Sequence, residues 1–365
     1  WGAVWRRYGG GDTCPVRIED ADHQGEGDNM AIVEDLIVSE RGAFVGLHGK
    51  RLRVSVSGTR IVEAPLLHLR SVQIHTRSAA LSAAALSACC EAGIPVHFVD
   101  SFDGNYATVL SPNLTTVIHT RRCQLDALNS RVGVVIAQQI GVGKIKSQAA
   151  NLRYLARRQP EEIAHALQQD SIDLLAYADR LTAICAETIA DVRAEFMGIE
   201  GQCARIYWAA VGALIPEEYG WPGRTGRHAK DPVNCLLNYG YGILYGEVQN
   251  ALVIAGLEPY AGLVHTDRPG KPSLTLDLIE EFRAPIVDRT VIGLVNRHYD
   301  VRFEDNGRLE RDFRKNFAEH IMSRLNAQGI YQKKRYQLRS IIQLQARALA
   351  AALRGEQPYE PYTGG

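Results

Sequence analysis

Residues 36–66, LIVSERGAFVGLHGKRLRVSVSGTRIVEAPL, decide the first part of the fold. Four short runs rich in Val, Ile and Leu are separated by three dipeptides: Arg41-Gly42, Gly49-Lys50 and Gly58-Thr59. Such runs broken by glycine at this spacing are typical of strands joined by tight hairpins. We therefore expect a small antiparallel sheet. Because its edges need cover, the strands between residues 36 and 67 are predicted to build a homodimer interface.

The sequence outside this stretch predicts two domains and two end segments. The alanine-rich residues 78–92 predict one helix that stops at Gly93, and IPVHFVD and NYATVLS then return to extended structure. After residue 113 the apolar period is helical almost to the end. The predicted fold is α+β, with a small antiparallel β domain (30–112) before an all-α domain (113–356). Residues 1–29, rich in Gly, Asp and Glu, are expected to be a linker or extension, and residues 357–365 a flexible tail.

Composition excludes several classes of protein. The 365 residues carry 41 Lys and Arg against 41 Asp and Glu, which argues against a uniformly basic surface. Seven cysteines without a CxxC pair give no sign of a zinc knuckle or an iron-sulfur cluster. No apolar run approaches the roughly 20 residues of a membrane span, and the N-terminus does not look like a signal peptide. We expect a cytoplasmic protein that does not act at a membrane.

The zero net charge conceals a segregation along the helical part. Residues 115–158 hold eight basic residues and one acidic residue, whereas residues 160–196 hold eight acidic and two basic residues. Residues 331–354 add six basic residues and no acidic one. Basic helices of this kind suit a phosphate backbone, because Lys and Arg displace condensed counterions. A set of solvated helix faces is the alternative interpretation of the same charges.

A group of carboxylates and one imidazole lies between residues 198 and 283. If Ser273 caps a helix, Asp277 and Glu280 fall on one face at spacing i, i+3. His265 precedes a Gly-Pro-rich turn that can fold it back over these carboxylates, and Glu200 lies in an apolar stretch between two glycines. Such oxygen-rich sets suit Mg²⁺ or Mn²⁺, which polarise phosphodiesters. A salt-bridge network is the alternative.

Four strings in this region carry a resemblance to a known family. They are EGQCARIYW (200–208), DPVNCLLNYGY (231–241), GLEPYAGLVH (256–265) and SLTLDLIEEFR (273–283). In this order and spacing the sequence resembles the CRISPR-associated integrase, the larger of the two universal spacer-acquisition proteins. Some relatives are fused behind a reverse transcriptase or an iron-sulfur nuclease, so residues 1–29 fit the linker of such a fusion.

The resemblance implies roles for individual residues. Carried over by position, the family's metal ligands and catalytic residues fall on Glu200, His265 and Glu280, with Asp277 as a further acidic ligand. The implied DNA-binding residues are Arg121, Arg122, Lys144, Lys146, Gln148, Arg224 and Arg227.

The resemblance also implies a reaction and partners. A DNA 3′-hydroxyl would attack a phosphodiester at the border of a CRISPR repeat, supported by Mg²⁺ or Mn²⁺. The expected partners are a double-stranded DNA fragment, repeat DNA, a second copy of the chain, and a small second adaptation protein that bridges two dimers. Two alternatives stay open: a stand-alone metal-dependent DNase acting on branched or single-stranded DNA, and a non-catalytic DNA-binding scaffold.

Overall fold

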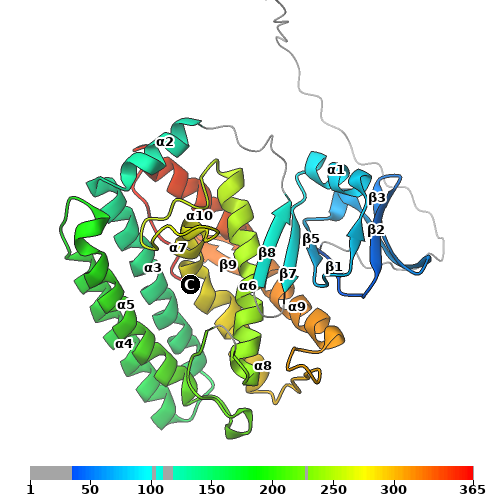
Figure 1. Cartoon of the computed structure of the whole chain (residues 1–365). Helices are drawn as coiled ribbons and strands as arrows, with labels where there is room; N and C mark the ends of the chain where they lie inside the picture. Colours follow the sequence, from blue (N-terminus) through cyan, green and yellow to red (C-terminus); the bar gives the residue numbers. More distant parts are fainter. Residues whose placement is uncertain (1–34, 101–103, 110–117, 227–228, 365) are drawn as a thin grey trace, which may run out of the picture. The chain divides into compact units, whose positions relative to one another are not determined.

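The first part of the chain folds into two four-stranded sheets (Figure 1). The computed structural model describes residues 35–100, 104–109, 118–226 and 229–364. One sheet has the order β1-β5-β7-β8, with the bounds Asp35–Val38, Ser71–Ile74, Val96–Asp100 and Gly104–Val109. The other has the order β4-β3-β2-β6, with the bounds Thr59–Pro65, Arg51–Val56, Ala43–His48 and Ala80–Leu81.

Two of the three predicted hairpins are confirmed. Strands β2 and β3 pair antiparallel around Gly49, which has φ 59°, and β3 and β4 pair antiparallel around Ser57 and Gly58, with φ 49° and 81°. Positive φ at a turn of this kind is the geometry that favours glycine. The third prediction is wrong, because the turn at Gly42 joins β1 to β2, which lie in different sheets.

The α+β class is confirmed, but the sheets are mixed rather than purely antiparallel. Strands β1, β5 and β7 run parallel, and so do β2 and β6. The chain from β5 to β7 passes through helix α1 (Ala83–Glu91), and a crossover of this length brings a strand back in the same direction. Helix α1 is shorter than the predicted helix over residues 78–92, because Ser82 caps it and residues 80–81 pair with β2.

From residue 118 onward the described chain is mainly helical. The helices are α2 (Ile118–Ala127), α3 (Arg131–Ala156), α4 (Glu161–Thr182), α5 (Ile189–Gly212), α6 (Pro232–Ile254), α7 (Ser273–Phe282), α8 (Arg289–Val295), α9 (Arg311–Asn326) and α10 (Leu338–Leu353). A π-helical segment, Arg283–Asp288, connects α7 directly to α8. None of the described helices is both long and apolar enough to cross a membrane.

This region is not all-α, which corrects the prediction. Strands β9 (Gln328–Tyr331) and β10 (Lys334–Gln337) form a hairpin between α9 and α10. Its two turn residues, Gln332 and Lys333, have φ 47° and 63°. The hairpin was missed because its strands are only four residues long and lie inside a basic stretch that resembles the flanking helices.

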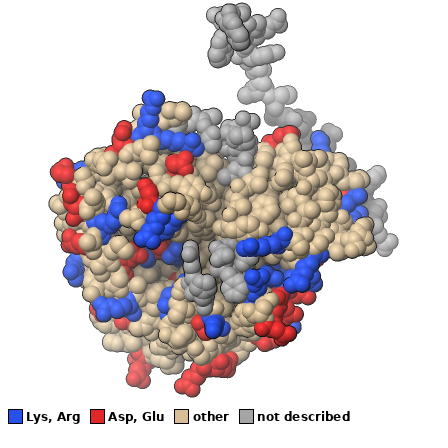
Figure 2. Space-filling view, viewed as in Figure 1, with Lys and Arg blue, Asp and Glu red and all other residues tan. Residues whose placement is uncertain are grey.

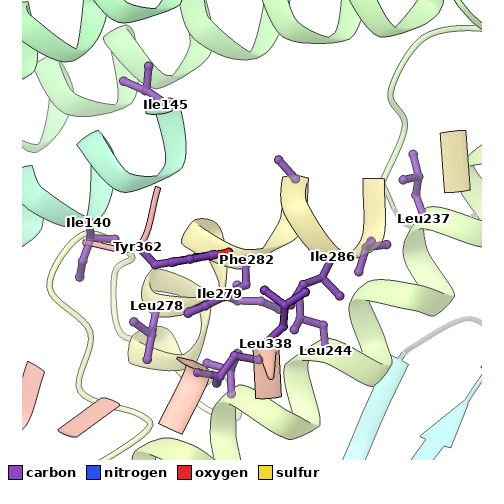
Figure 3. Packing of buried hydrophobic residues seen from close by; sticks show 14 of the residues in the cluster. Ile140, Ile145, Leu237, Leu244, Leu278, Ile279, Phe282, Ile286, Leu338 and Tyr362 are labelled. Carbon is purple, nitrogen blue, oxygen red and sulfur yellow. The ribbon is translucent and has the colours of Figure 1, made fainter. Parts of the chain in front are cut away.

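Helix α7 lies deep in the core of the helical region. Figure 3 shows its Ile279 and Phe282 near Leu244 of α6, with Leu278 and, on α6, Leu237 at opposite sides of the same cluster. All five side chains are at most 1% exposed. Dense packing on both sides leaves this helix little freedom to shift, so the side chains that it presents to neighbouring helices are held in place.

The C-terminal segment packs against α7, which differs from the predicted flexible tail. Tyr359 and Tyr362 are 4% and 3% exposed, and the Tyr362 ring stacks on Phe282 with centroids 5.3 Å apart. The buried Glu281 accepts hydrogen bonds from the Tyr359 hydroxyl (2.5 Å) and from the Tyr362 backbone N–H (2.8 Å). The bonded residues are 78 and 81 positions apart in the sequence, so these contacts fix the side of α7 that carries Glu281 to the end of the chain.

Polar contacts join the sheets to the helices. Arg339 of α10 binds Asp35 of β1 and Glu247 of α6, with N–O distances of 3.0 and 3.1 Å. The Tyr239 hydroxyl of α6 hydrogen-bonds the imidazole of His75, just after β5. The Arg339 side chain is 14% exposed and its two acidic partners 6% each, while Tyr239 and His75 are at most 2% exposed, so these contacts tie the predicted β domain firmly to the helices. The predicted boundary near residue 112 lies outside the described residues.

Candidate active site

Four polar side chains from different elements line one small cavity among the helices. Glu200 comes from α5, Glu280 from α7, Lys144 from α3, and His265 from the loop before α7. The cavity has a volume of about 40 Å³, and most of its other lining residues are apolar. That volume suits a single ion with a few waters, and the apolar lining strengthens electrostatic interactions inside it.

The orientation of His265 is fixed by Asp277 of α7. Its Nδ1 lies 2.6 Å from Asp277 Oδ1, and the carboxylate also accepts the backbone N–H groups of Leu263 (2.6 Å), Val264 (3.1 Å) and His265 (3.0 Å). Since the carboxylate only accepts, Nδ1 carries the proton and Nε2 keeps a free lone pair. The turn therefore folds His265 back over α7, as the sequence predicted.

The same contacts give Asp277 another role than the predicted one. Its side chain has no exposed surface, and both carboxylate oxygens are engaged by four donors. These contacts occupy the carboxylate and hold the imidazole of His265 in place, an arrangement typical of histidines that bind metals. Ser273 is also corrected: it is the first residue of α7 rather than its cap, and its hydroxyl donates to the Thr266 carbonyl (3.1 Å).

Lys144 lies between the two glutamates. Its ammonium contacts Glu200 Oε1 and lies 2.9 Å from Glu280 Oε2. Burial by itself would lower the pKa of Lys144, but the two carboxylates outweigh burial and raise it. A positive charge thus occupies the position between Glu200 and Glu280.

Glu280 is the more buried of the two glutamates. Its side chain is 7% exposed against 36% for Glu200, and its Oε1 accepts a 2.6 Å hydrogen bond from Arg283. Burial would raise the pKa of Glu280, but Arg283 and Lys144 together lower it to about 2. The group is ionised at neutral pH and is available as a ligand for a cation.

These residues fit the divalent cation that the sequence predicts. Within the described parts of the chain, no three His, Cys, Asp or Glu side chains already lie close enough together to hold a metal. Lys144 is the physical reason, because its ammonium separates the two carboxylates. The donor chemistry fits: two carboxylates that already share one positive charge, with the free Nε2 of His265 lining the same cavity, suit Mg²⁺ or Mn²⁺.

Sequence reasoning missed the place of Lys144 in this cavity and the pairing of Arg283 with Glu280 beside it. The family resemblance implies a DNA-binding role for Lys144, yet its side chain is only 13% exposed. One signal could have revealed it: Lys144 follows the buried Ile140 by one helical turn, so it lies on the apolar face of α3. A lysine at such a position requires a buried acidic partner.

The predicted DNA-binding residues divide into two groups. Arg122 and Lys146 are exposed and Arg121 is half-buried, whereas Gln148 is 6% exposed, and Arg227 lies outside the described residues. Figure 2 shows Lys and Arg side chains interspersed with acidic ones on the visible face of the helical region, without one continuous basic patch. For the exposed Arg122 and Lys146, a solvated helix face therefore stays open as the alternative interpretation of their charge.

Gln148 and Arg224 line a second cavity, which adjoins the first. It has a volume of about 160 Å³ and shares Lys144 and Glu280 with the first cavity, while Arg283 lines only the second. Arg224 donates to Asn238 Oδ1 (2.7 Å), and its guanidinium lies 5.4 Å from the centroid of the Tyr241 ring. A carboxylate and imidazole pair beside an arginine-lined cavity is typical of proteins that act on phosphodiesters.

Comparison with known proteins identifies the family. The profile of the family described as CRISPR associated protein Cas1 matches residues 36–323. A protein from Archaeoglobus fulgidus named CRISPR-associated endonuclease Cas1 1 is 34% identical over 342 residues, covering 90% of this chain and 98% of its own. One of the same name from Francisella tularensis subsp. novicida is 30% identical, covering 90% and 99%. The chain belongs to the Cas1 family.

Solved structures agree with this assignment. A casposase bound to integration product is similar with a TM-score of 0.77 at 25% identity, covering 91% of this chain and 93% of its own. The Cas1 protein TM1797 from Thermotoga maritima has the same fold, with a TM-score of 0.74 at 20% identity. The fold is also found in a chain of a Cas6-RT-Cas1–Cas2 complex, with a TM-score of 0.73, where the match covers 93% of this chain and 37% of the other.

Proposed function

We propose that this chain is a metal-dependent DNA integrase and endonuclease of CRISPR adaptation. The observation that carries the proposal is that Glu200, Glu280 and His265 line one cavity together with the Lys144 ammonium. The adjoining cavity is lined by Arg224 and Arg283. In the reaction a DNA 3′-hydroxyl gives up its proton as its oxygen forms a bond to phosphorus at the repeat border. The bond from phosphorus to the leaving 3′-oxygen breaks, and that oxygen takes up a proton.

Each residue of the site has a distinct task in this proposal. Glu200, Glu280 and Nε2 of His265 would hold Mg²⁺ or Mn²⁺, which when bound supplies Lewis-acid stabilisation of the charge on the phosphodiester. Asp277 keeps Nε2 directed at the site. Arg224 and Arg283 line the adjoining cavity and offset phosphate charge. Lys144 must release at least one glutamate before the ion binds.

The names of the relatives support the choice of reaction. The casposase is described as bound to an integration product, and the curated relatives are named endonucleases. Hydrolysis and strand transfer differ only in whether water or a DNA hydroxyl is the nucleophile. We therefore keep the stand-alone DNase as the second candidate, which the endonuclease names favour.

We also propose that the chain acts as a homodimer with a small second adaptation protein. The sheet β4-β3-β2-β6 exposes large apolar side chains, with Phe44 46%, Leu47 37% and Ile61 49% exposed. Exposed apolar residues grouped on one sheet are typical of a protein interface. A related fold occurs in a complex whose name includes Cas2, so a Cas2-like protein is the expected bridging partner.

A strand-transfer assay tests the proposed function. Purified protein, a short double-stranded DNA fragment and a plasmid with a CRISPR repeat are incubated with Mn²⁺ or Mg²⁺, with and without the bridging protein. We expect joined products that EDTA abolishes, and at least a hundredfold loss in Glu200→Gln, Glu280→Gln and His265→Ala. Asp277→Asn should lose tenfold to a hundredfold, the usual effect of removing such a partner.

The products distinguish the candidates. Cleavage without joining, lost in the same variants, would favour the stand-alone DNase. If the protein binds DNA but forms neither product with any divalent cation tested, only the non-catalytic DNA-binding scaffold would remain as an interpretation. Glu195→Gln is the matched control, because Glu195 is exposed on α5 and does not line the cavity, so strand transfer should persist.

A further inference from the structure

A third cavity, larger than the two described above, lies at the C-terminal end of α3. It has a volume of about 650 Å³ and is bordered by the C-terminal end of α3, by α8 and by α9. Its polar lining includes Tyr154, Arg158, Arg289, Arg297, His320 and Arg324. Tyr154 is ten residues from Lys144, so the cavity is about 15 Å along the helix from the candidate active site.

The residues that line this cavity include four arginines and one histidine but no acidic side chain. None of the four arginines forms an ion pair with any carboxylate in the described part of the chain. Elsewhere in the described chain Arg283 is paired with Glu280 and Arg339 with Glu247, which contrasts with the lack of acidic partners here.

Two of the arginines are held rigidly with their terminal nitrogens unused. Arg289 donates from Nε to Asn151 Oδ1 (3.1 Å), and its guanidinium lies 4.2 Å from the centroid of the Tyr154 ring. Arg324 donates from Nε to the Pro285 carbonyl (2.9 Å). Neither donates from its terminal nitrogens to a described residue, so each keeps the two-pronged face that binds phosphate oxygens.

The electrostatics of the pair favour binding of an anion. Burial, and then the proximity of Arg324, lower the pKa of Arg289 to about 10, and burial likewise lowers the pKa of Arg324. Both groups remain charged at neutral pH and repel each other without a counterion from the protein. An anion between them would relieve this cost, and a multiply charged one would do so best.

We propose that this cavity binds a phosphate group, carried either by a nucleic acid strand or by a free phosphorylated small molecule. The rigid guanidinium groups of Arg289 and Arg324 grip the phosphate oxygens at the inner wall. The exposed Arg158 and Arg297 attract the charge at the rim. This site is separate from the proposed catalytic chemistry, since it shares no lining residue with either cavity at Glu280.

Binding of pyrophosphate to the full-length protein tests the site itself. Titration calorimetry and thermal melting are carried out in EDTA, so that no divalent cation binds at Glu200 and Glu280. We expect pyrophosphate to bind and to raise the melting temperature. The double variant Arg289→Gln/Arg324→Gln should lose at least tenfold in affinity, since hydrogen bonds to charged groups are lost. Arg311→Gln, at the exposed start of α9, is the matched control and should bind as the wild type does.

A second pair of variants guards against misfolding, and a second probe separates the two sources of phosphate. Arg158→Glu/Arg297→Glu changes exposed side chains only and should also weaken pyrophosphate binding. A 12-nucleotide single-stranded DNA is titrated over a range of salt concentrations. A weaker affinity and a flatter salt dependence in the variants would identify a nucleic acid strand as the ligand, whereas unchanged DNA binding would identify a free phosphorylated molecule. If neither pair alters pyrophosphate or DNA binding, the proposal is wrong.

Discussion

Replacing Lys144 by methionine should destabilise the protein and strengthen its binding of Mn²⁺. Lys144 is the cation between Glu200 and Glu280, and methionine keeps its length without the charge. Removing one partner of a buried ion pair costs about 3–5 kcal/mol. The lower end applies here, because the Glu200 side chain is 36% exposed and water screens its charge. We therefore expect a loss of about 3 kcal/mol in the free energy of unfolding without metal.

A divalent cation should recover most of this loss. A ligand that binds only the folded state stabilises it by about 2.7 kcal/mol at a hundredfold excess over its dissociation constant. In the wild type, Lys144 must first leave the carboxylates, which weakens the apparent affinity for metal. The variant lacks this competitor, so Mn²⁺ should bind it at least tenfold more tightly, equivalent to about 1.4 kcal/mol.

The assay combines urea unfolding with Mn²⁺ titration calorimetry, each in EDTA-treated protein. Lys146→Met serves as the control, because Lys146 is exposed two residues further along the same helix. Its stability and metal affinity should match the wild type. Two results would refute the reasoning: a Lys144→Met protein that is as stable as the wild type without metal, or one that binds Mn²⁺ more weakly.

Two further predictions concern buried groups away from the metal site. Burial lowers the pKa of His75 and of His97 to about 3, so the unfolded chain takes up protons near pH 6.5 while the folded chain does not. Each histidine should therefore leave the free energy of unfolding unchanged above pH 6.5 and lower it by up to about 1.4 kcal/mol per pH unit below pH 6.5. In urea unfolding between pH 7 and 5, His97→Gln should lose stability less steeply than the wild type. An equal slope in the two proteins would contradict this prediction. Tyr359→Phe removes the donor to Glu281 and should cost about 1–3 kcal/mol. Because burial already raises the pKa of Glu281 to about 7, above its unfolded value, the loss should be larger at pH 8 than at pH 6, and equal losses at both would show that the hydroxyl does not hold the carboxylate.

The order of strands and helices follows from local patterns. Short β-branched runs, glycines with positive φ at residues 49 and 58, and the helical period after residue 113 are properties of neighbouring residues, so they can be recognised without a structure. Pairing is different. Strand β1 lies beside β5, whose residues are 36 positions further along the chain, and no local pattern specifies that partner.

The candidate ligands could likewise be named from the sequence, but their tasks could not. The spacing of Asp277 and Glu280 puts both on one helix face, and the sequence alone makes them equivalent. The structure separates them, because the backbone of residues 263–265 saturates the oxygens of Asp277.

By itself the sequence determined the α+β class, the family resemblance and the set of acidic and imidazole residues. Only the tertiary structure decided that Lys144 lies between Glu200 and Glu280, that Asp277 orients His265, and that the C-terminal tyrosines hold Glu281. It also brought the unpaired Arg289 and Arg324 together. The physical reason is that the charge state and availability of a side chain depend on donors and charges within a few ångströms, and these come from segments far apart in the chain.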